Sequence, residues 1–353
     1  MAIQSISNVK ISGISACVPK YIESNTNSHL FEKPEDAQRF IDNTGVVERR
    51  IATDAICSSD LCYHAAEKLI SEIGWDKSEI DCLIFITQTP DYIVPATSCG
   101  LQHRLGLSEE CHSFDVTLGC SAWVYGLSII GSLLSAGFLK KGLLLVGETT
   151  SKTKSKTDKS TYPLFGDAGT ATLLEYSPDS PSIKMHSGTD GSKQKSIYIP
   201  DGGFRNQTTL ESLEMIEVEP GVTRNRLQYI MDGAQVFTFT ITKVPKSINK
   251  LIDSFEIDKD KVDYLLLHQA NKMIVDKIAG KLKFPAEKVP GTLSKFGNTS
   301  CSSIPLTIVS ELNEQVRNQH LNLIASGFGS GLSLASAYFE LDKIVCPELI
   351  EIE

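Results

Sequence analysis

The sequence has no long apolar run and no excess of basic residues. Nowhere do about 18 apolar residues follow one another, and the first 13 residues lack the basic region and apolar core of a signal peptide. The formal net charge of −9 disfavours general binding to nucleic acid. We therefore expect a cytoplasmic protein that binds neither nucleic acid nor a membrane.

The nine cysteines have no paired CxxC spacing, and their number is odd. A structural zinc site and a disulfide framework are therefore both disfavoured. The chain also has no glycine-rich phosphate loop of the Walker or dinucleotide type. The sequence thus contains no recognisable signal for a metal or a bound nucleotide.

Strand and helix patterns alternate along the chain. A helical pattern at 61–73 precedes a buried strand at 82–86, and the alternation continues from there. This order favours an α/β fold with a largely parallel sheet. A chain of 353 residues with 41% hydrophobic content is long enough for one large or two medium domains.

Two segments of the chain resemble each other at a constant separation. Positions 68–70, 76–77 and 81–83 recur in similar form 182 residues later, at 250–252, 258–259 and 263–265. A chance match is the alternative, because amphipathic helices repeat easily. The constant offset instead favours a duplicated domain with two similar halves. We predict halves at 1–178 and 179–353, divided in a polar stretch that contains Pro178 and Pro181.

Cys120 stands at the centre of the most informative stretch. A strand pattern at 113–117, a turn at Gly119 and an apolar stretch at 122–136 predict a strand, a tight turn and a buried helix. Cys120 would then lie at the first turn of this helix, where free backbone N–H groups and the helix dipole lower a thiol's pKa. Cys120 is therefore a candidate nucleophile; the alternative is a small buried hydrophobic residue.

Three further signals lie in the second half. His268 follows a predicted strand at 262–267, at the sheet edge where α/β proteins bind ligands, although a structural hydrogen bond is the alternative. Asn298 lies in a turn of small residues, where an N-cap is the alternative. The glycine-rich stretch 326–331 can present backbone N–H groups to an oxyanion, or serve only as a flexible turn.

Together these motifs resemble one family. The runs DVTLGCSAW (115–123), FGDAG (165–169), HQAN (268–271), GNTS (297–300) and GFGSG (327–331) occur in the order and spacing typical of 3-oxoacyl-acyl-carrier-protein synthase III, a branch of the thiolase superfamily. The combination of Cys, His and Asn separates this branch from thiolases and from elongating ketosynthases. The resemblance covers essentially the whole chain.

The resemblance implies a duplicated α/β fold of five layers (αβαβα), an obligate homodimer and decarboxylative Claisen condensation. Cys120 would take an acyl group from a thioester, with the backbone N–H groups of Cys120 and Gly331 binding the oxyanion. His268 and Asn298 would bind the carbonyl of malonyl-acyl-carrier protein and stabilise the enolate that forms when carbon dioxide leaves. No metal or redox cofactor is implied.

The resemblance also suggests residues that bind the substrate and its carrier. These are Val94, Trp123, Lys159 and Phe296 for the substrate, and Lys272, Lys277 and Lys281 as a basic docking face for acyl-carrier protein. A solvated helix surface is the alternative explanation of the three lysines. Arg39 and Lys159 stand where the family commonly has a Trp and an Arg that enclose the adenine of coenzyme A, so we expect a carrier-protein donor. Val94 replaces a larger aromatic residue, which predicts acyl chains longer than acetyl.

Two other functions remain open from the sequence. An enzyme of this kind can use Cys120 to transfer an acyl group to an alcohol or amine without decarboxylation. A catalytically silent scaffolding subunit is the third reading, and it is disfavoured because Cys120, His268 and Asn298 are all present. The retained His268 and Asn298 favour condensation over simple acyl transfer.

Overall fold

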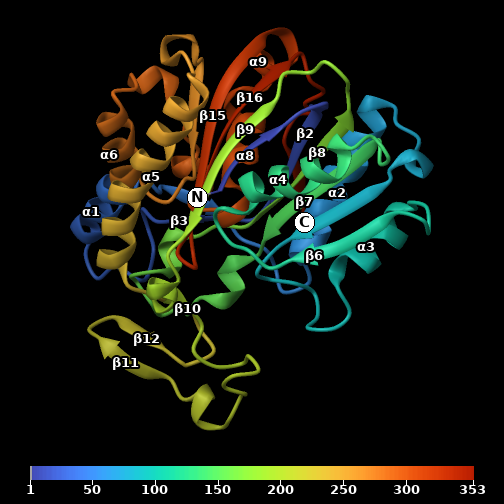
Figure 1. Cartoon of the computed structure of the whole chain (residues 1–353). Helices are drawn as coiled ribbons and strands as arrows, with labels where there is room; N and C mark the ends of the chain where they lie inside the picture. The colour runs from blue at the N-terminus through green and yellow to red at the C-terminus, as the bar shows by residue number, and fades with distance from the viewer. Residues whose placement is uncertain (1) are drawn as a thin grey trace.

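A computed structural model describes residues 2–353 of the chain. Its strands form two large sheets (Figure 1). The first sheet has the order β17 (Ile350–Ile352), β2 (Val9–Pro19), β8 (Ala168–Tyr176), β7 (Lys141–Glu148), β5 (Cys82–Ile86) and β6 (His112–Val116). The second has the order β1 (Ala2–Ile6), β9 (Ile183–Thr189), β16 (Ser333–Asp342), β15 (His320–Gly329) and β14 (Tyr264–Leu267).

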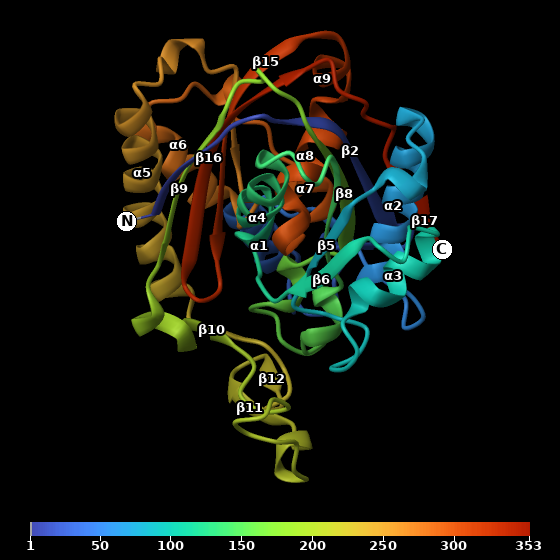
Figure 2. The same ribbon diagram turned by 45° about the vertical axis from the view of Figure 1, so that its right-hand side comes forward.

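The helices complete the five expected layers (Figures 1 and 2). The outer face of the first sheet is covered by α2 (Ser58–Ile73) and α3 (Thr97–Leu105), and that of the second by α5 (Gly233–Phe255) and α6 (Lys272–Leu282). Between the sheets lie α4 (Ala122–Ser135) and α8 (Ser303–Glu311). The remaining helices are α1 (Pro34–Thr44), α7 (Leu293–Phe296) and α9 (Asn313–Asn318). The fold prediction is therefore confirmed.

The central helix α4 is mostly apolar because it packs against both sheets. Its side chains share one hydrophobic core with strands of the two sheets. Gly126 allows the close approach, because a Cβ there would lie 2.7 Å from Leu144 of β7. Burial of most of the helix explains why its only polar side chains after the first turn are the serines Ser128, Ser132 and Ser135.

The repeated segment is present in both halves. Asp76 and Asp258 each cap a short 3₁₀ helix by accepting a hydrogen bond from the backbone N–H two residues later. Asp81 and Asp263 each accept backbone N–H groups at the start of the neighbouring strand, β7 or β15. The same capping chemistry at the same offset of 182 residues explains the likeness seen in the sequence.

The two ends of the chain cross between the halves. β1 pairs with β9 of the second sheet, whereas β17 pairs with β2 of the first. The division at 178/179 falls between β8 and β9, yet it assigns both terminal strands to the half whose sheet they do not join. This boundary therefore stays a proposal.

An arm projects from the body between β10 (Ile197–Tyr198) and β13 (Ile230–Met231). It includes the hairpin of β11 (Ile216–Glu219) and β12 (Val222–Arg224), at the bottom of Figures 1 and 2. A further small pair, β3 (Ile22–Ser24) and β4 (Glu48–Arg50), lies near α1 in the sequence. Within residues 2–353, no helix has both the length and the apolar character needed to cross a membrane.

Candidate active site

Cys120 lies in the turn between β6 and α4. It comes directly before Ser121, the N-cap residue, and α4 then begins at Ala122 as predicted and ends at Ser135. The thiol is partly buried, and its sulfur lies 3.5 Å from the hydroxyl oxygen of Ser300. The strand, turn and helix are present as predicted. Cys120 lies just before the N-terminus of α4, whereas the sequence had suggested a place in its first turn.

A glycine on β15 makes room for the thiol. A Cβ on Gly329 would lie 2.6 Å from Cys120 Cβ and 2.9 Å from its Sγ, so no larger residue fits here without a shift. Gly331, which the family resemblance assigns to the oxyanion site, has a φ of +129°, and a Cβ added there would lie 3.2 Å from the backbone nitrogen of Ser333. The role of its N–H group stays a prediction, whereas Gly329 is the glycine in contact with the sulfur.

His268 follows β14 at the edge of the second sheet. Its Nδ1 is 2.7 Å from the hydroxyl of Ser303, the first residue of α8, and its ring packs edge-on against Phe328 at 5.3 Å. Burial lowers the pKa of His268 to about 3, although a hydrogen bond to the backbone of Ser300 opposes the shift. The imidazole is therefore neutral near pH 7.

Asn298 is fixed by hydrogen bonds on both sides of its amide. Its Oδ1 accepts a hydrogen bond from the backbone N–H of Ser300 at 2.9 Å, and its Nδ2 donates to Ala270 O at 3.4 Å. A side-chain amide has two N–H donors. With Oδ1 occupied and one donor in a long bond, the amide presents a donor to the space around it.

These three side chains line one pocket of about 120 Å³, although 148 residues separate Cys120 from His268 along the chain. The rest of its lining is largely apolar and aromatic, from Leu164, Phe165, Ile197, Tyr229, Val236, Phe237, Ile274 and Phe328. The nucleophile, a neutral imidazole and an amide donor thus meet in a mostly apolar environment. Such an arrangement can form an acyl-enzyme and stabilise charge on an oxygen.

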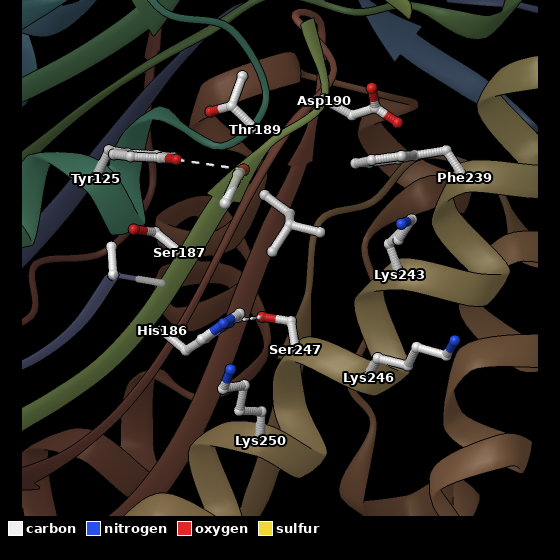
Figure 3. A pocket seen from close by; sticks show the side chains of 13 residues that line it. Tyr125, His186, Ser187, Thr189, Asp190, Phe239, Lys243, Lys246, Ser247 and Lys250 are labelled. Atoms are coloured by element: carbon white, nitrogen blue, oxygen red, sulfur yellow. Dashed lines mark hydrogen bonds between the residues drawn. The ribbon is translucent and has the colours of Figure 1, made fainter. Parts of the chain in front are cut away.

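A larger cavity of about 820 Å³ lies elsewhere, between β9 and α5 (Figure 3). Lys243, Lys246 and Lys250 of α5 line one side, and His186 binds the hydroxyl of Ser247 at 2.8 Å. No cysteine lines this cavity. The smaller pocket is therefore the candidate active site, because it alone of the two contains Cys120, His268 and Asn298.

The expected lowering of the Cys120 pKa is wrong. Burial raises the pKa of the thiol to about 11, while the Ser300 hydroxyl and the Lys154 ammonium act in the opposite direction. Desolvation outweighs the helix end here, because the sulfur lies in a mostly apolar pocket rather than in water. The resting cysteine is a thiol, and its proton must move when it reacts.

The residues suggested for substrate binding do not line the pocket of their own chain. Trp123 lies in the core, where its indole N–H donates to Thr172 Oγ1 at 3.0 Å, and Phe296 is also buried in that core. Lys159 is exposed beside Gly221 of the projecting arm. Val94 is 80% exposed and stays a prediction, since its proposed role depends on a second subunit.

The suggested docking lysines lie on α6. Lys272 pairs with Asp276, and Lys281 donates to Ile241 O at 2.8 Å. Lys277 is exposed and lies one turn from Lys281 on this helix. The role of the three lysines in docking stays a prediction.

Sequence reasoning missed four residues around the site. Ser300 contacts the thiol and Ser303 holds His268; both lie in the GNTS stretch and the helix start that follows it, so their position was the available signal. Glu148 and Lys154 are also missed, although both are buried beside the pocket. A lysine within a polar run normally indicates a solvated loop.

The chain was compared with known proteins. Residues 114–191 match the family described as 3-oxoacyl-[acyl-carrier-protein (ACP)] synthase III, and residues 252–341 match its C-terminal part. A beta-ketoacyl-[acyl-carrier-protein] synthase III of Streptococcus agalactiae is 36% identical over 93% of this chain and 97% of its own. That of Enterococcus faecalis is 35% identical over 92% of this chain and 98% of its own.

The solved structures give the same result. A 3-oxoacyl-(acyl-carrier protein) synthase from Burkholderia xenovorans has a TM-score of 0.93 and 36% identity, and the match covers 99% of both chains.

Within residues 2–353, no group of three or more His, Cys, Asp or Glu side chains could hold a metal ion.

Proposed function

This chain belongs to the 3-oxoacyl-[acyl-carrier-protein] synthase III family, and from that premise we propose that it joins an acyl group to malonyl-acyl-carrier protein by decarboxylative Claisen condensation. The observation that carries the proposal is the single pocket lined by Cys120, His268 and Asn298. Acyl-carrier protein is the proposed partner, because the relatives are named as acyl-carrier-protein synthases.

The first half-reaction acylates Cys120. The sulfur attacks the carbonyl carbon of an acyl thioester, a new S–C bond forms, and the donor's C–S bond breaks. The thiol proton passes to neutral His268 and then to the departing thiol of the donor. Burial keeps the Cys120 sulfur protonated and His268 neutral, so the proton leaves the thiol only as the new S–C bond forms.

The second half-reaction forms the carbon–carbon bond. The malonyl group loses carbon dioxide, and the electron pair becomes an enolate whose oxygen accepts hydrogen bonds from Asn298 and from neutral His268, in the tautomer that carries its proton on the nitrogen facing the pocket. The enolate carbon attacks the acyl carbonyl, the C–S bond to Cys120 breaks, and the sulfur takes up a proton from solvent, the one proton that the overall condensation consumes. Donors fixed before the charge develops each contribute about 3 kcal/mol to such a step.

Mass spectrometry tests the proposal directly. The intact protein is incubated with an acyl thioester, and Cys120 is expected to gain the acyl mass. Addition of malonyl-acyl-carrier protein should then release a 3-oxoacyl-carrier protein and carbon dioxide. Acyl transfer to an alcohol or amine with no 3-oxoacyl product would contradict condensation and favour the second function open from the sequence.

A homodimer is part of the proposal. β6 is an edge strand of its sheet, and the loop beside it exposes Tyr92, Ile93 and Val94 at 69, 74 and 80%. Exposed edge strands and clustered apolar side chains are typical of protein interfaces. We also propose a cytoplasmic location, which agrees with nine free cysteines.

A further inference from the structure

A second cavity of about 240 Å³ adjoins the catalytic pocket. Ile197 and Tyr229 line both, so the two spaces share a wall. Ile197 and Ile199 are the only aliphatic residues among the twelve that line the second cavity. A cavity built to hold a plain alkyl chain would instead be lined mainly by apolar side chains.

Lys154 is a buried amine in this second cavity; burial lowers its pKa to about 7, although the nearby Glu148 favours the charged ammonium. Its ammonium lies 3.4 Å from the centroid of the Tyr229 ring and 4.3 Å from that of Phe165, and it donates a hydrogen bond to Thr153 Oγ1 at 3.0 Å. The residue is only 4% exposed. Within residues 2–353, no carboxylate lies at salt-bridge distance from this ammonium. It therefore retains donors that no protein acceptor uses.

Glu148 is the matching acceptor in the same cavity. It is fully buried at the end of β7, and its carboxylate accepts hydrogen bonds from Gln88 N at 2.8 Å and from Thr89 Oγ1 at 3.0 Å. These bonds leave part of its accepting capacity free, because a carboxylate has about four lone-pair sites. The cavity thus contains a donor and an acceptor that are too far apart to satisfy each other.

We propose that Lys154 and Glu148 select a short acyl group that carries a hydroxyl substituent. A hydroxyl oxygen accepts a hydrogen bond from the ammonium while its O–H donates to the carboxylate, and the net charge of the cavity does not change. An alkyl chain would leave the remaining donors of Lys154 and the remaining acceptor sites of Glu148 unused, and a second carboxylate would face Glu148. This inference rests on the proposed function and names its acyl substrate. It differs from the expectation of longer alkyl chains, which considered Val94 alone.

The test compares three acyl thioesters on one carrier: butyryl, 3-hydroxybutyryl and succinyl. The specificity constant for condensation with malonyl-acyl-carrier protein is measured for the intact protein. We expect the hydroxyacyl group to be preferred over butyryl by at least about tenfold, the effect of one charged hydrogen bond. Lys154→Met should reduce that ratio to near one. Lys152→Met is the matched control and should keep the ratio, because Lys152 is exposed and bonds only to the carbonyls of Asp54 and Ile56.

The outcomes separate this inference from the proposed function. If Cys120 gains no acyl mass from any thioester, the proposed function fails. If all three thioesters acylate Cys120 but the wild-type protein prefers butyryl or succinyl, only the assignment of a hydroxyacyl group is wrong. An unchanged ratio in Lys154→Met also overturns it. The ratio compares two substrates of one preparation, so partial unfolding of a variant does not alter it.

Discussion

Each half of the molecule has a cysteine at the equivalent position before its central helix, and only one of the two cysteines is proposed to react. Cys120 comes directly before Ser121, the N-cap of α4, and Cys301 comes directly before Ser302, the N-cap of α8. The two positions are 181 residues apart, close to the repeat of 182. A helix start therefore does not by itself distinguish them.

The surroundings of the two cysteines differ. Cys120 lines the catalytic pocket beside Gly329, whereas Cys301 is 1% exposed in the core between the sheets. Burial raises the pKa of both thiols, and that of Cys301 well above its ordinary value. The comparison teaches that access to a pocket with a proton acceptor, and not the helix end alone, decides which thiol can be a nucleophile.

Replacement of each cysteine tests this comparison most strongly. Cys120→Ala should lower the rate of condensation at least about 1,000-fold, because no acyl-enzyme can form. Cys301→Ala, the counterpart change, should keep the rate and reduce stability by about 1 kcal/mol through the small cavity that it leaves. Steady-state kinetics and thermal unfolding measure the two effects. Acyl mass on Cys301 in the first variant would contradict the comparison.

The C-terminal half can be tested for separate roles in the two half-reactions. Asn298→Ala should lower condensation by about 100- to 1,000-fold, the effect of removing one oxyanion donor, and leave acylation of Cys120 largely intact. His268→Ala should slow both half-reactions, because His268 also accepts the thiol proton in our proposal. Reactions stopped at successive times and analysed by intact-protein mass spectrometry give the acylation rate of each variant, and product analysis gives its condensation rate. Equal loss of acylation in both variants would show that Asn298 has a different role.

The pH dependence of Cys120 alkylation shows which effect on its pKa is larger, the lowering by the helix N-terminus or the raising by burial. With a pKa of about 11, the thiolate fraction of Cys120 should rise about tenfold for each pH unit from 6 to 9, and alkylation by iodoacetamide should rise with it. The sign follows because only the thiolate reacts, and a raised pKa keeps it scarce until the pH approaches that value. Peptide mapping gives the rate at Cys120. A plateau near pH 7 would mean that the helix end dominates.

The smallest expected effect concerns the outer helices of the two halves. Lys277→Glu on α6 should raise KM for malonyl-acyl-carrier protein roughly two- to fivefold at low salt, because a solvated ion pair contributes little. Lys68→Glu on α2 of the other half is the control and should leave KM unchanged. Added salt should shrink the difference. An equal effect of both changes would show that net charge, rather than docking on α6, is responsible.

The sequence predicted the local elements of the site well. The strand before His268 was expected at 262–267 and is β14, Tyr264–Leu267, and the helix after Cys120 was expected at 122–136 and is α4, Ala122–Ser135. These elements can be predicted because they depend on the spacing of apolar residues and on turn residues, both of which are visible within a few neighbouring positions. The placement of Trp123 and Phe296 in the substrate site does not hold, because both are core residues of the two-sheet interior.

Residues 113–123, 268–271 and 297–300 by themselves determined the candidate nucleophile and its two partners, since helix starts and strand ends are properties of neighbouring positions. The likeness between 68–83 and 250–265 indicated the duplicated domain. Only the tertiary structure decided the exchange of β1 and β17 between the sheets, the difference between Cys120 and Cys301, and the placement of Lys154 and Glu148 in one cavity. Each of these depends on desolvation and on contacts between residues far apart in the chain. Burial sets whether a thiol, an imidazole or an ammonium is charged, and no local pattern specifies it.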